Sequence, residues 1–527
     1  MRTAAVTTLL LVPIVAGGFL LQEPTTRSSV RLFDQVRTLV ETRYVDSLKE
    51  GQVFEKAAKG MVHELNDPYS ELLTPKESDV FNRSTNGRYG GTGMLLEEHP
   101  GTFVSVQRVF PNTPAAEAGV QEGDRIIAID GASTQGWEID KVSDHLRGTP
   151  GSQVAVTYAR PGVTDPIKLK FTRVVVHVPA VAFTGLYDNG QVGYIPLQTF
   201  NENAAEEVAT AVAKLEEQGA KGIVLDMRDN GGGIVDQALA VSGLFLQDGQ
   251  EIVSVRARNT PAEVARARGP HLATSIPLVV LVDGGSASAT EIVAGALQDH
   301  DRALIVGTTS FGKGLVQSVF PLDGGYFLKM TTGKWFTPSG RSIHRERQLL
   351  PDGRFVETHP DSLETDSARK SRPAFKSDAG RVVYGGGGIT PDVIVVDDTL
   401  STLEQQFLRS IASKGQILQS VLDTYAFELK GSVKRDFTAL PAWTAELTHR
   451  LTSKGVTIDP KYDGVAGRLL TRELERRVAR LAFGDAAAKE RDLKTDHQLT
   501  TAMDLLRKAA TQPELFTVAH SAVAVRR

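Results

Sequence analysis

The stretch Ile276 to Gln317 decides the fold, and it reads IPLVVLVDGGSASATEIVAGALQDHDRALIVGTTSFGKGLVQ. Its first apolar run predicts a buried strand, and the apolar residues spaced three and four apart after it predict a helix. A second buried strand is expected from Arg302 to Val306, followed by a glycine-rich turn that holds Lys313. Ser286 and Ser288 therefore lie on a strand-to-helix turn, and a lysine follows the next strand.

A serine and a lysine in these places suit a catalytic dyad. A serine hydroxyl is a weak nucleophile until a base takes its proton, and a neutral lysine amine can do so. Because the ordinary pKa of lysine is about 10.4, the amine must be kept out of water to be neutral near pH 7. Phe311, Leu315 and Val316 flank Lys313 and are expected to exclude water, while the amide of Gln317 is suited to orient the amine.

Three simpler interpretations compete with the dyad. Ser288 and Glu291 fit S-x-x-E, which is a helix capping box. Gly307 to Gly314 reads G-x-x-x-x-G-K-G, a phosphate-binding loop that lacks its Ser/Thr and is followed by a predicted strand instead of a helix. Lys313 is also compatible with an ordinary solvated turn lysine. A Ser-His-Asp arrangement using His300, at the predicted end of the helix, is a weaker alternative.

The segments GSASATEIVAGALQD and FGKGLVQ resemble the catalytic signature of the carboxyl-terminal processing (tail-specific) serine peptidases. The resemblance implies that Ser288 is the nucleophile, Lys313 the general base and Gln317 the amide that orients the lysine. Asp283 and Thr290 stand where the family pattern leads us to expect Asn and Ser.

A second motif, L-D-x-R-x-N-x-G-G, covers Leu225 to Gly233. It resembles the segment of the same family that supplies the oxyanion hole. The resemblance implies that the backbone N–H groups of Gly232 and Ala289 hold the tetrahedral oxygen. Gly231 stands where proline is common, which leaves the choice among the three consecutive glycines open.

Strands and helices alternate from about residue 177 to 399. The predicted elements are a strand at Val192 to Ile195, a helix at Glu202 to Gln218, a strand at Gly222 to Met227 and a helix at Ile234 to Leu246. Such alternation predicts an α/β core with largely parallel strands, and ligands bind beyond the carboxyl ends of such strands. The family resemblance implies crotonase/Clp-protease-like ββα layers for this core.

Residues 89–176 read as short alternating strands, and PAAEAGVQEGDRIIAIDG within them resembles a PDZ domain. PDZ domains capture a peptide carboxyl terminus by adding it as a strand. The stretch matching the carboxylate-binding loop contains Gly91, Thr92, Gly93 and Met94. The alternative is a plain glycine turn before a strand.

The rest of the chain is expected to be helical. Residues 28–88 read as amino-terminal helices, and residues 400–527 as a helical carboxyl-terminal module that packs on the core or on a second subunit of a homo-oligomer. Arg2 followed by an apolar run to Leu21 predicts a signal peptide or membrane anchor over residues 1–25.

The composition narrows the function classes. The chain has 527 residues, a net charge of −4 and no cysteine, which argues against a nucleic-acid partner and excludes disulfides and thiol chemistry. The histidines lack metal-ligand spacing, and neither a metal nor an organic cofactor is implied.

Together these features predict an exported, periplasmic or extracytoplasmic, membrane-associated serine endopeptidase. It cleaves near the carboxyl terminus of protein substrates captured by the PDZ domain. A non-catalytic carrier on the same fold, as in retinoid-carrying relatives, and an NTP-binding protein are the alternatives.

Overall fold

The computed structural model describes residues 26–98, 103–269, 271–272, 275–349, 355–357, 366–396, 400–493 and 495–525. The predicted signal peptide or anchor lies outside the described residues. The chain divides into two units, one of Met1–Pro75 with Gln317–Thr331 and one of Lys76–Val316 with Thr332–Arg527. Within the described ranges, no helix has both the length and the apolar character needed to cross a bilayer.

The first unit carries helices and a short strand. Its elements are α2 (Thr26–Arg43), α3 (Glu50–His63), β1 (Glu71–Leu73) and the short helix η1 (Asp323–Gly325). β1 pairs antiparallel with β18 (Phe327–Phe336), so that Leu73 lies opposite Phe327. The side-chain amide of Gln317 donates to the Tyr69 carbonyl (3.0 Å). This bond ties the segment after α3 to the strand that carries Gln317.

The second unit is built on a six-stranded sheet with the order β10-β11-β12-β15-β16-β23. Its strands are β10 (Gly185–Tyr187), β11 (Val192–Pro196), β12 (Gly222–Asp226), β15 (Leu278–Val282), β16 (Leu304–Gly307) and β23 (Val393–Ile394). All neighbours are parallel except β10 and β11. The predicted α/β core with parallel strands is therefore present, with strand ends within two residues of those predicted.

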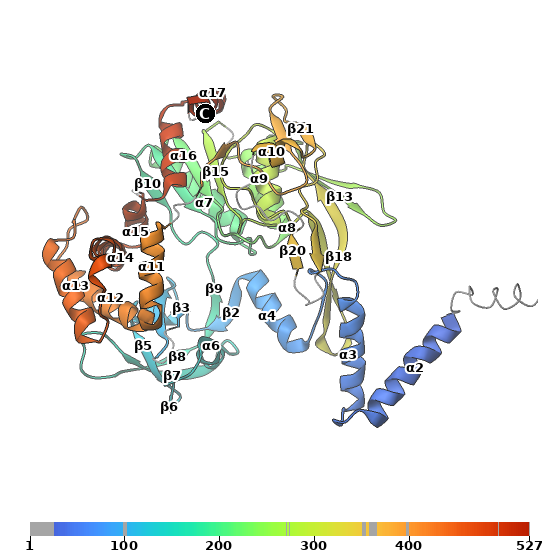
Figure 1. Ribbon diagram of the computed structural model, residues 1–527, viewed down its shortest axis with the longest axis horizontal. Helices are drawn as coiled ribbons and strands as arrows, with labels where there is room; N and C mark the ends of the chain where they lie inside the picture. Colours follow the sequence, from blue (N-terminus) through green and yellow to red (C-terminus); the bar gives the residue numbers. More distant parts are fainter. Residues whose placement is uncertain are drawn as a thin grey trace, which may run out of the picture. The chain divides into compact units, whose positions relative to one another are not determined.

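Both faces of this sheet are buried, which explains why its strands read as unbroken apolar runs. One face packs against α7 (Ala204–Glu217), α8 (Val235–Phe245) and α9 (Ala289–Asp299). The opposite face packs against α16 (His497–Arg507) and α17 (Gln512–Val525), which Figure 1 shows beside the sheet. Side chains alternate accordingly, since Ile223 and Leu225 belong to the first cluster and Val224 to the second.

A second sheet, with the order β3-β4-β5-β7-β8 and β6 beside β5, forms the predicted strand-rich part. Its elements are β3 (Met94–Glu97), β4 (Ser105–Val109), α5 (Pro114–Glu117), β5 (Arg125–Ile129), β6 (Ala132–Ser133), α6 (Ile139–Leu146), β7 (Gln153–Ala159) and β8 (Ile167–Thr172). It is entered after α4 (Pro75–Asn86) through β2 (Arg88–Gly91), which pairs antiparallel with the exit strand β9 (Val174–His177). β3 is an edge strand of this sheet.

The structure contains other strands, and of these only β17 was predicted from the sequence. They are β13 (Glu251–Ala257), β14 (Glu263–Arg266), β17 (Leu315–Pro321), β18, β19 (Arg347–Leu349), β20 (Phe355–Glu357), β21 (Ala374–Lys376) and β22 (Val382–Tyr384), with α10 (Asp366–Lys370) between β20 and β21. β13 pairs antiparallel with β14 and, through Ser254 opposite Phe336, with the end of β18.

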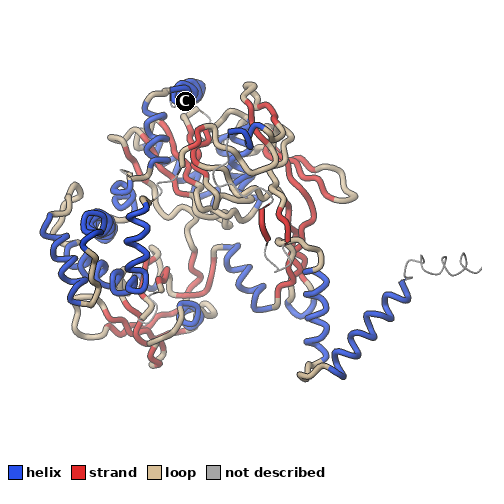
Figure 2. The backbone as a smooth tube through the Cα atoms, in the orientation of Figure 1, coloured by secondary structure: helices blue, strands red, loops and turns tan. Residues whose placement is uncertain are grey.

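The carboxyl-terminal helices fall into two packing groups, which Figure 2 shows as the helix-rich part of the chain. The helices are α11 (Thr402–Ile411), η2 (Ala412–Lys414), α12 (Gly415–Leu429), α13 (Pro441–Ser453), η3 (Pro460–Tyr462), α14 (Asp463–Phe483) and α15 (Asp485–Asp492), before α16 and α17. The elements α11 to α14 enclose a core of their own that includes Leu470, Leu474 and Val478 of α14. Leu499, Met503 and Leu506 of α16 instead pack on the core sheet. The helices of residues 400–527 are therefore not one packing unit.

Candidate active site

Ser288 occupies a strained turn between β15 and α9. It is half-buried and has φ 57° and ψ −114°, close to the first central position of a type II′ turn, where glycine is favoured. A non-glycine residue whose backbone is held in this region costs on the order of 1–3 kcal/mol, and the conformation persists only when its surroundings enforce it. The strain marks this serine as a functional candidate.

The structure separates the two candidate serines. The hydroxyl of Ser286 is fully buried and donates to the Met227 carbonyl (2.8 Å), and it accepts from the N–H of Asp283 (2.9 Å). Ser286 is therefore a structural residue of the turn. Ser288 remains as the serine whose position suits a nucleophile.

The buried carboxylate of Glu291 connects the serine turn to the lysine loop. Its Oε2 accepts from the N–H groups of Ser288 (2.9 Å) and Lys313 (2.8 Å). Its Oε1 accepts from the N–H of Gly312 (2.7 Å) and the hydroxyl of Ser310 (2.5 Å). Burial raises the pKa of Glu291, and the four donors partly offset this effect. The S-x-x-E pattern thus does more than cap the helix, because its glutamate holds both candidate catalytic segments.

The same bonds weigh against the phosphate-loop interpretation of Gly307 to Gly314. The N–H of Phe311 donates to the Ser286 carbonyl (3.0 Å), and the next two N–H groups donate to Glu291. A phosphate loop needs such N–H groups free to face its ligand. The chain also continues into strand β17 instead of a helix.

Lys313 is half-buried, as are the three apolar residues that flank it. Its carbonyl accepts from the indole N–H of Trp335 (3.1 Å), a residue that is 1% exposed. A Cβ added at Gly312 would lie 2.8 Å from the Arg345 side chain, so this neighbour of the lysine has no room for a side chain without movement. The backbone of Lys313 is therefore held firmly, and its side chain is only partly shielded from water.

The loop after β12 is fastened to the serine turn. The carbonyl of Asn230 accepts from the N–H of Ala287 (3.0 Å) and the hydroxyl of Thr290 (2.8 Å). A Cβ at Gly232 would lie 3.0 Å from the Cβ of Ser288, and Gly232 has φ +99°. The predicted oxyanion-hole segment and the predicted nucleophile are thus brought together.

The two predicted oxyanion donors differ in their availability. The N–H of Gly232 donates to Oδ1 of Asn230 (2.9 Å), so it is occupied in this conformation. The N–H groups of Ala289, Gly231 and Gly233 have no hydrogen-bond partner among the residues that the structure describes. An oxyanion at Ser288 would therefore meet Ala289 readily, whereas Gly232 would first have to release Asn230.

His300 does not complete a Ser-His-Asp arrangement. It lies twelve residues after Ser288 at the far end of α9, which is about 18 Å along the helix axis. Its Nδ1 pairs with Asp378 (2.7 Å) and its Nε2 with the Glu251 carbonyl (2.7 Å). Gln317 belongs to the amino-terminal unit, where its amide contacts Tyr69. No group of three or more acidic or histidine side chains in the described ranges is placed to hold a metal ion.

A groove of about 420 Å³ runs between β3 and α6. Its lining includes the apolar side chains of Met94, Leu96, Phe110, Ile139 and Leu146. β3 is an edge strand of its sheet, so its outer backbone groups are available to pair with an added strand.

The predicted carboxylate loop contributes to the wall of this groove. Thr92 and Met94 line it, and the N–H groups of Thr92 and Gly93 have no partner within the described part of the chain. Gly93 has φ +94°, and a Cβ there would lie 2.2 Å from that of Thr113, so this position requires glycine. The loop therefore places backbone donors without a described partner beside an apolar groove, as capture of a peptide carboxylate requires.

Three segments of the chain match known protein families. Residues 191–354 match Peptidase family S41, residues 105–160 match the PDZ domain, and residues 21–76 match the Activating protease CtpB N-terminal domain.

Two curated relatives and one solved structure illustrate the similarity. The Carboxy-terminal-processing protease of Bartonella bacilliformis is 38% identical over 327 residues, covering 61% of this chain and 74% of that protein. CtpA of Bacillus subtilis, a carboxy-terminal processing protease, is 33% identical over 347 residues, covering 65% and 73%. The solved photosystem II D1 C-terminal processing protease is 29% identical, covers 69% of this chain and 86% of its own, and has a TM-score of 0.37.

These matches and the site define a serine-type peptidase that carries a PDZ domain. Within that class, the chain belongs to the carboxy-terminal processing proteases of peptidase family S41.

Replacing Glu291 by glutamine is expected to destabilise the site. An amide keeps one acceptor oxygen but presents an NH₂ group to two donors, and each buried donor left unpaired costs about 1–3 kcal/mol. We expect the free energy of unfolding to fall by about 2–5 kcal/mol and kcat by at least about tenfold, since small misplacements of reacting groups are costly. Denaturant unfolding and peptidase kinetics measure both.

Asp392→Asn is the matched control for Glu291→Gln. Asp392 accepts from the N–H of Ile305 (2.8 Å) and from the side-chain amide of Gln298 (3.2 Å). Gln298 lies about 15 Å along α9 from Ser288. The control should lose stability and keep kcat per folded molecule. A Glu291→Gln enzyme with unchanged kcat would show that this carboxylate does not position the reacting groups.

A pair of carboxylates also lies beside the serine turn. Oδ1 of Asp283 accepts from the N–H groups of Asp229 (2.9 Å), Gly285 (3.0 Å) and Ser286 (3.1 Å). The negative charge of Asp283, followed by burial, raises the pKa of Asp229. A raised folded-state pKa means that this group stabilises the fold at acidic pH and that the contribution is lost as pH rises through that pKa.

Asp283→Asn should therefore change how stability depends on pH. Asparagine keeps an acceptor for the turn and removes the repulsion of ionised Asp229. The melting temperature at pH 7 minus that at pH 4 should therefore be larger in the variant than in the wild type by about 2 °C or more. Asp229→Asn should give a similar change, and the double variant should add little. A pH dependence identical to that of the wild type would rule out repulsion between these carboxylates.

Proposed function

We propose that Ser288 and Lys313 form the catalytic dyad with which this peptidase cleaves near the carboxyl terminus of exported proteins. The observation that carries the proposal is the Glu291 carboxylate, which accepts from the backbone N–H groups of both residues. The strained backbone of Ser288 supports it, because such strain gathers at catalytic residues. Membership of a peptidase family favours this function over a carrier on the same fold.

In the first half of the reaction, the Ser288 oxygen attacks the carbonyl carbon of the scissile bond while its proton passes to the neutral amine of Lys313. The tetrahedral intermediate then expels the amine of the leaving peptide, which takes the proton from the Lys313 ammonium. Water then attacks the carbonyl carbon of the resulting ester while Lys313 takes its proton. The intermediate releases the Ser288 oxygen, which takes the proton back from Lys313.

The tetrahedral oxygen is held by backbone N–H groups. Ala289 supplies one donor, since its N–H has no partner among the described residues and begins helix α9, whose dipole favours negative charge. The glycine loop supplies the second. If Gly232 is that donor, substrate binding must break its bond to Asn230. Each such donor is worth about 3–4 kcal/mol of transition-state stabilisation.

The PDZ domain captures the substrate's tail. The N–H groups of Gly91, Thr92, Gly93 and Met94 receive the terminal carboxylate, and the tail pairs with the open edge of β3. The apolar lining of the groove favours tails that end in apolar residues.

The layout and location of the protein complete the proposal. Residues 1–25, apolar from Ala4 to Leu21, act as a signal peptide or membrane anchor that directs export, so that the rest of the chain is periplasmic or extracytoplasmic. The helical segment 28–88, the PDZ domain 89–176 and the core 177–399, with crotonase/Clp-protease-like layers, follow. Gln317 orients Lys313 in the competent enzyme.

Ser288→Ala and Lys313→Ala should each lower kcat on an unstructured protein substrate by a factor of at least about 10³. Lys313→Arg should be equally inactive, because arginine keeps the charge but cannot act as a base. Lys221→Ala is the control, since this exposed residue directly precedes β12 and should be neutral. Full activity in Lys313→Ala would end the dyad hypothesis.

Amidating the carboxyl terminus of a peptide substrate should raise KM about tenfold and leave kcat little changed, since a capture site acts before the chemical step. Paired kinetics on the free acid and the amide measure this. Equal KM values would remove tail capture while leaving the dyad untouched.

A further inference from the structure

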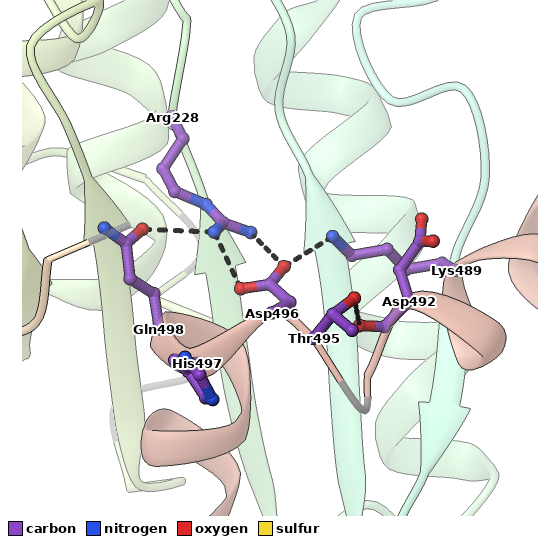
Figure 3. Close-up of a pocket in the computed structure, with 7 residues that line it drawn as sticks. All are labelled: Arg228, Lys489, Asp492, Thr495, Asp496, His497 and Gln498. Atoms are coloured by element: carbon purple, nitrogen blue, oxygen red, sulfur yellow. Dashed lines mark hydrogen bonds and ion pairs between the residues drawn. The ribbon is translucent and has the colours of Figure 1, made fainter. Parts of the chain in front are cut away.

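Arg228 begins the loop that carries the candidate oxyanion glycines, and its guanidinium is held from two sides. On one side, its Nε and Nη2 donate to the two oxygens of Asp226 (2.9 and 2.6 Å). On the other side, Nη1 and Nη2 donate to the two oxygens of Asp496 (2.9 and 2.8 Å), as Figure 3 shows. The side chains of Arg228 and Asp496 are 14% and 12% exposed, so solvent screens this pair only partly.

Asp496 is itself fixed in place. It caps α16 by accepting from the N–H of Leu499 (3.0 Å), and it also binds the ammonium of Lys489 (2.7 Å). Burial alone would raise the pKa of Asp496, but the hydrogen bonds and charges of Arg228 and Lys489 hold it well below its usual range. The carboxylate of Asp496 is therefore ionised at neutral pH.

The helix that Asp496 caps belongs to the core. Leu499, Ala502 and Leu506 of α16 are buried against the sheet face that includes Val224 and Leu281. The peptidase family match ends at residue 354, so this carboxylate comes from a segment to which that match assigns no role.

We propose that Asp496 is a positioning residue for peptide-bond hydrolysis: it holds Arg228 and, through it, the loop 228–233 against the serine turn. This proposal rests on the proposed function of Ser288. Two residues after Arg228, the Asn230 carbonyl accepts from the N–H of Ala287, directly beside Ser288. A change in the direction of the Arg228 side chain therefore reaches the oxyanion loop along a short stretch of backbone.

When the charge of Asp496 is lost, Arg228 keeps its bonds to Asp226 and a bond from Nη1 to the side-chain oxygen of Gln498 (3.1 Å), but only Asp226 is charged. A polar pocket of about 270 Å³ lies beside the ion pair, lined also by Asp492, Thr495 and His497. Figure 3 shows these side chains around the carboxylate. Without Asp496 the guanidinium is held by a carboxylate from one side only, and its tie to α16 is reduced to the neutral Gln498.

Asp496→Asn tests the proposal because it separates two roles of one side chain. Asparagine caps a helix as well as aspartate, so α16 should remain folded, while the bidentate ion pair is lost. We expect kcat to fall about tenfold with KM within twofold of wild type. Amide hydrogen exchange of residues 228–233 should become at least tenfold faster.

Arg507→Ala is the matched control on the same helix. Arg507 makes a bidentate pair with Asp188 of the core (2.8 Å for both bonds) and is 51% exposed. It should leave kcat and the exchange of residues 228–233 unchanged. Asp496→Asn with wild-type kcat and exchange would overturn the proposal, as would an equal effect of Arg507→Ala.

The exchange measurement separates this proposal from the proposed function. If the wild type shows no cleavage that depends on Ser288, the catalytic proposal fails, and faster exchange in Asp496→Asn still supports the ion pair's hold on the loop. If cleavage depends on Ser288 but Asp496→Asn is unchanged in both readouts, the catalytic proposal stands and the positioning role of Asp496 fails.

Discussion

The site depends on one buried carboxylate. Glu291 is fully buried, and an ionised carboxylate in such a place is unfavourable unless hydrogen bonds satisfy it. Four donors do so, and they come from two segments, the serine turn and the loop after β16. Neither segment can move without leaving a buried charge or a buried N–H unpaired. This mutual constraint explains how Ser288 keeps a backbone conformation that a free serine would leave.

The sheet order explains why these segments meet. β12, β15 and β16 are consecutive neighbours and run parallel, so the loops that follow them lie at the same edge. Each pair of loops is then joined by a side chain. Thr290 and Asp283 join the first loop to the serine turn, and Glu291 joins that turn to the lysine loop. Polar side chains, more than backbone pairing, hold the site in register.

The sequence predicted the core strands closely and the rest less well. β12 and β15 are buried on both faces, so their apolar runs were visible without any neighbour. β18 was missed because nearly all of its described side chains are half-buried, which leaves no clear alternation. The motifs located Ser288, Lys313 and the glycine loop, but no local pattern could show that the Gly232 N–H is already bonded to Asn230. An amphipathic stripe shows that a helix buries one face but does not show which partner covers it. Only the structure shows that α14 packs among the neighbouring helices and α16 on the core sheet.

Asp496 was beyond sequence reasoning for a simpler reason, since it lies 268 positions from Arg228. Gly231 stands where the family resemblance leads us to expect proline, and a Cβ there would meet nothing within 4 Å, so packing does not demand the glycine. A proline would stabilise the folded loop by about 0.4–1 kcal/mol, because it lowers the conformational entropy of the unfolded chain. This loop lacks that contribution. Its order rests instead on side-chain bonds, including one to a helix near the end of the chain. Under the proposal for Asp496, the loop 228–233 keeps its conformation only while α16 is packed on the sheet, which would make activity depend on the carboxyl-terminal helices.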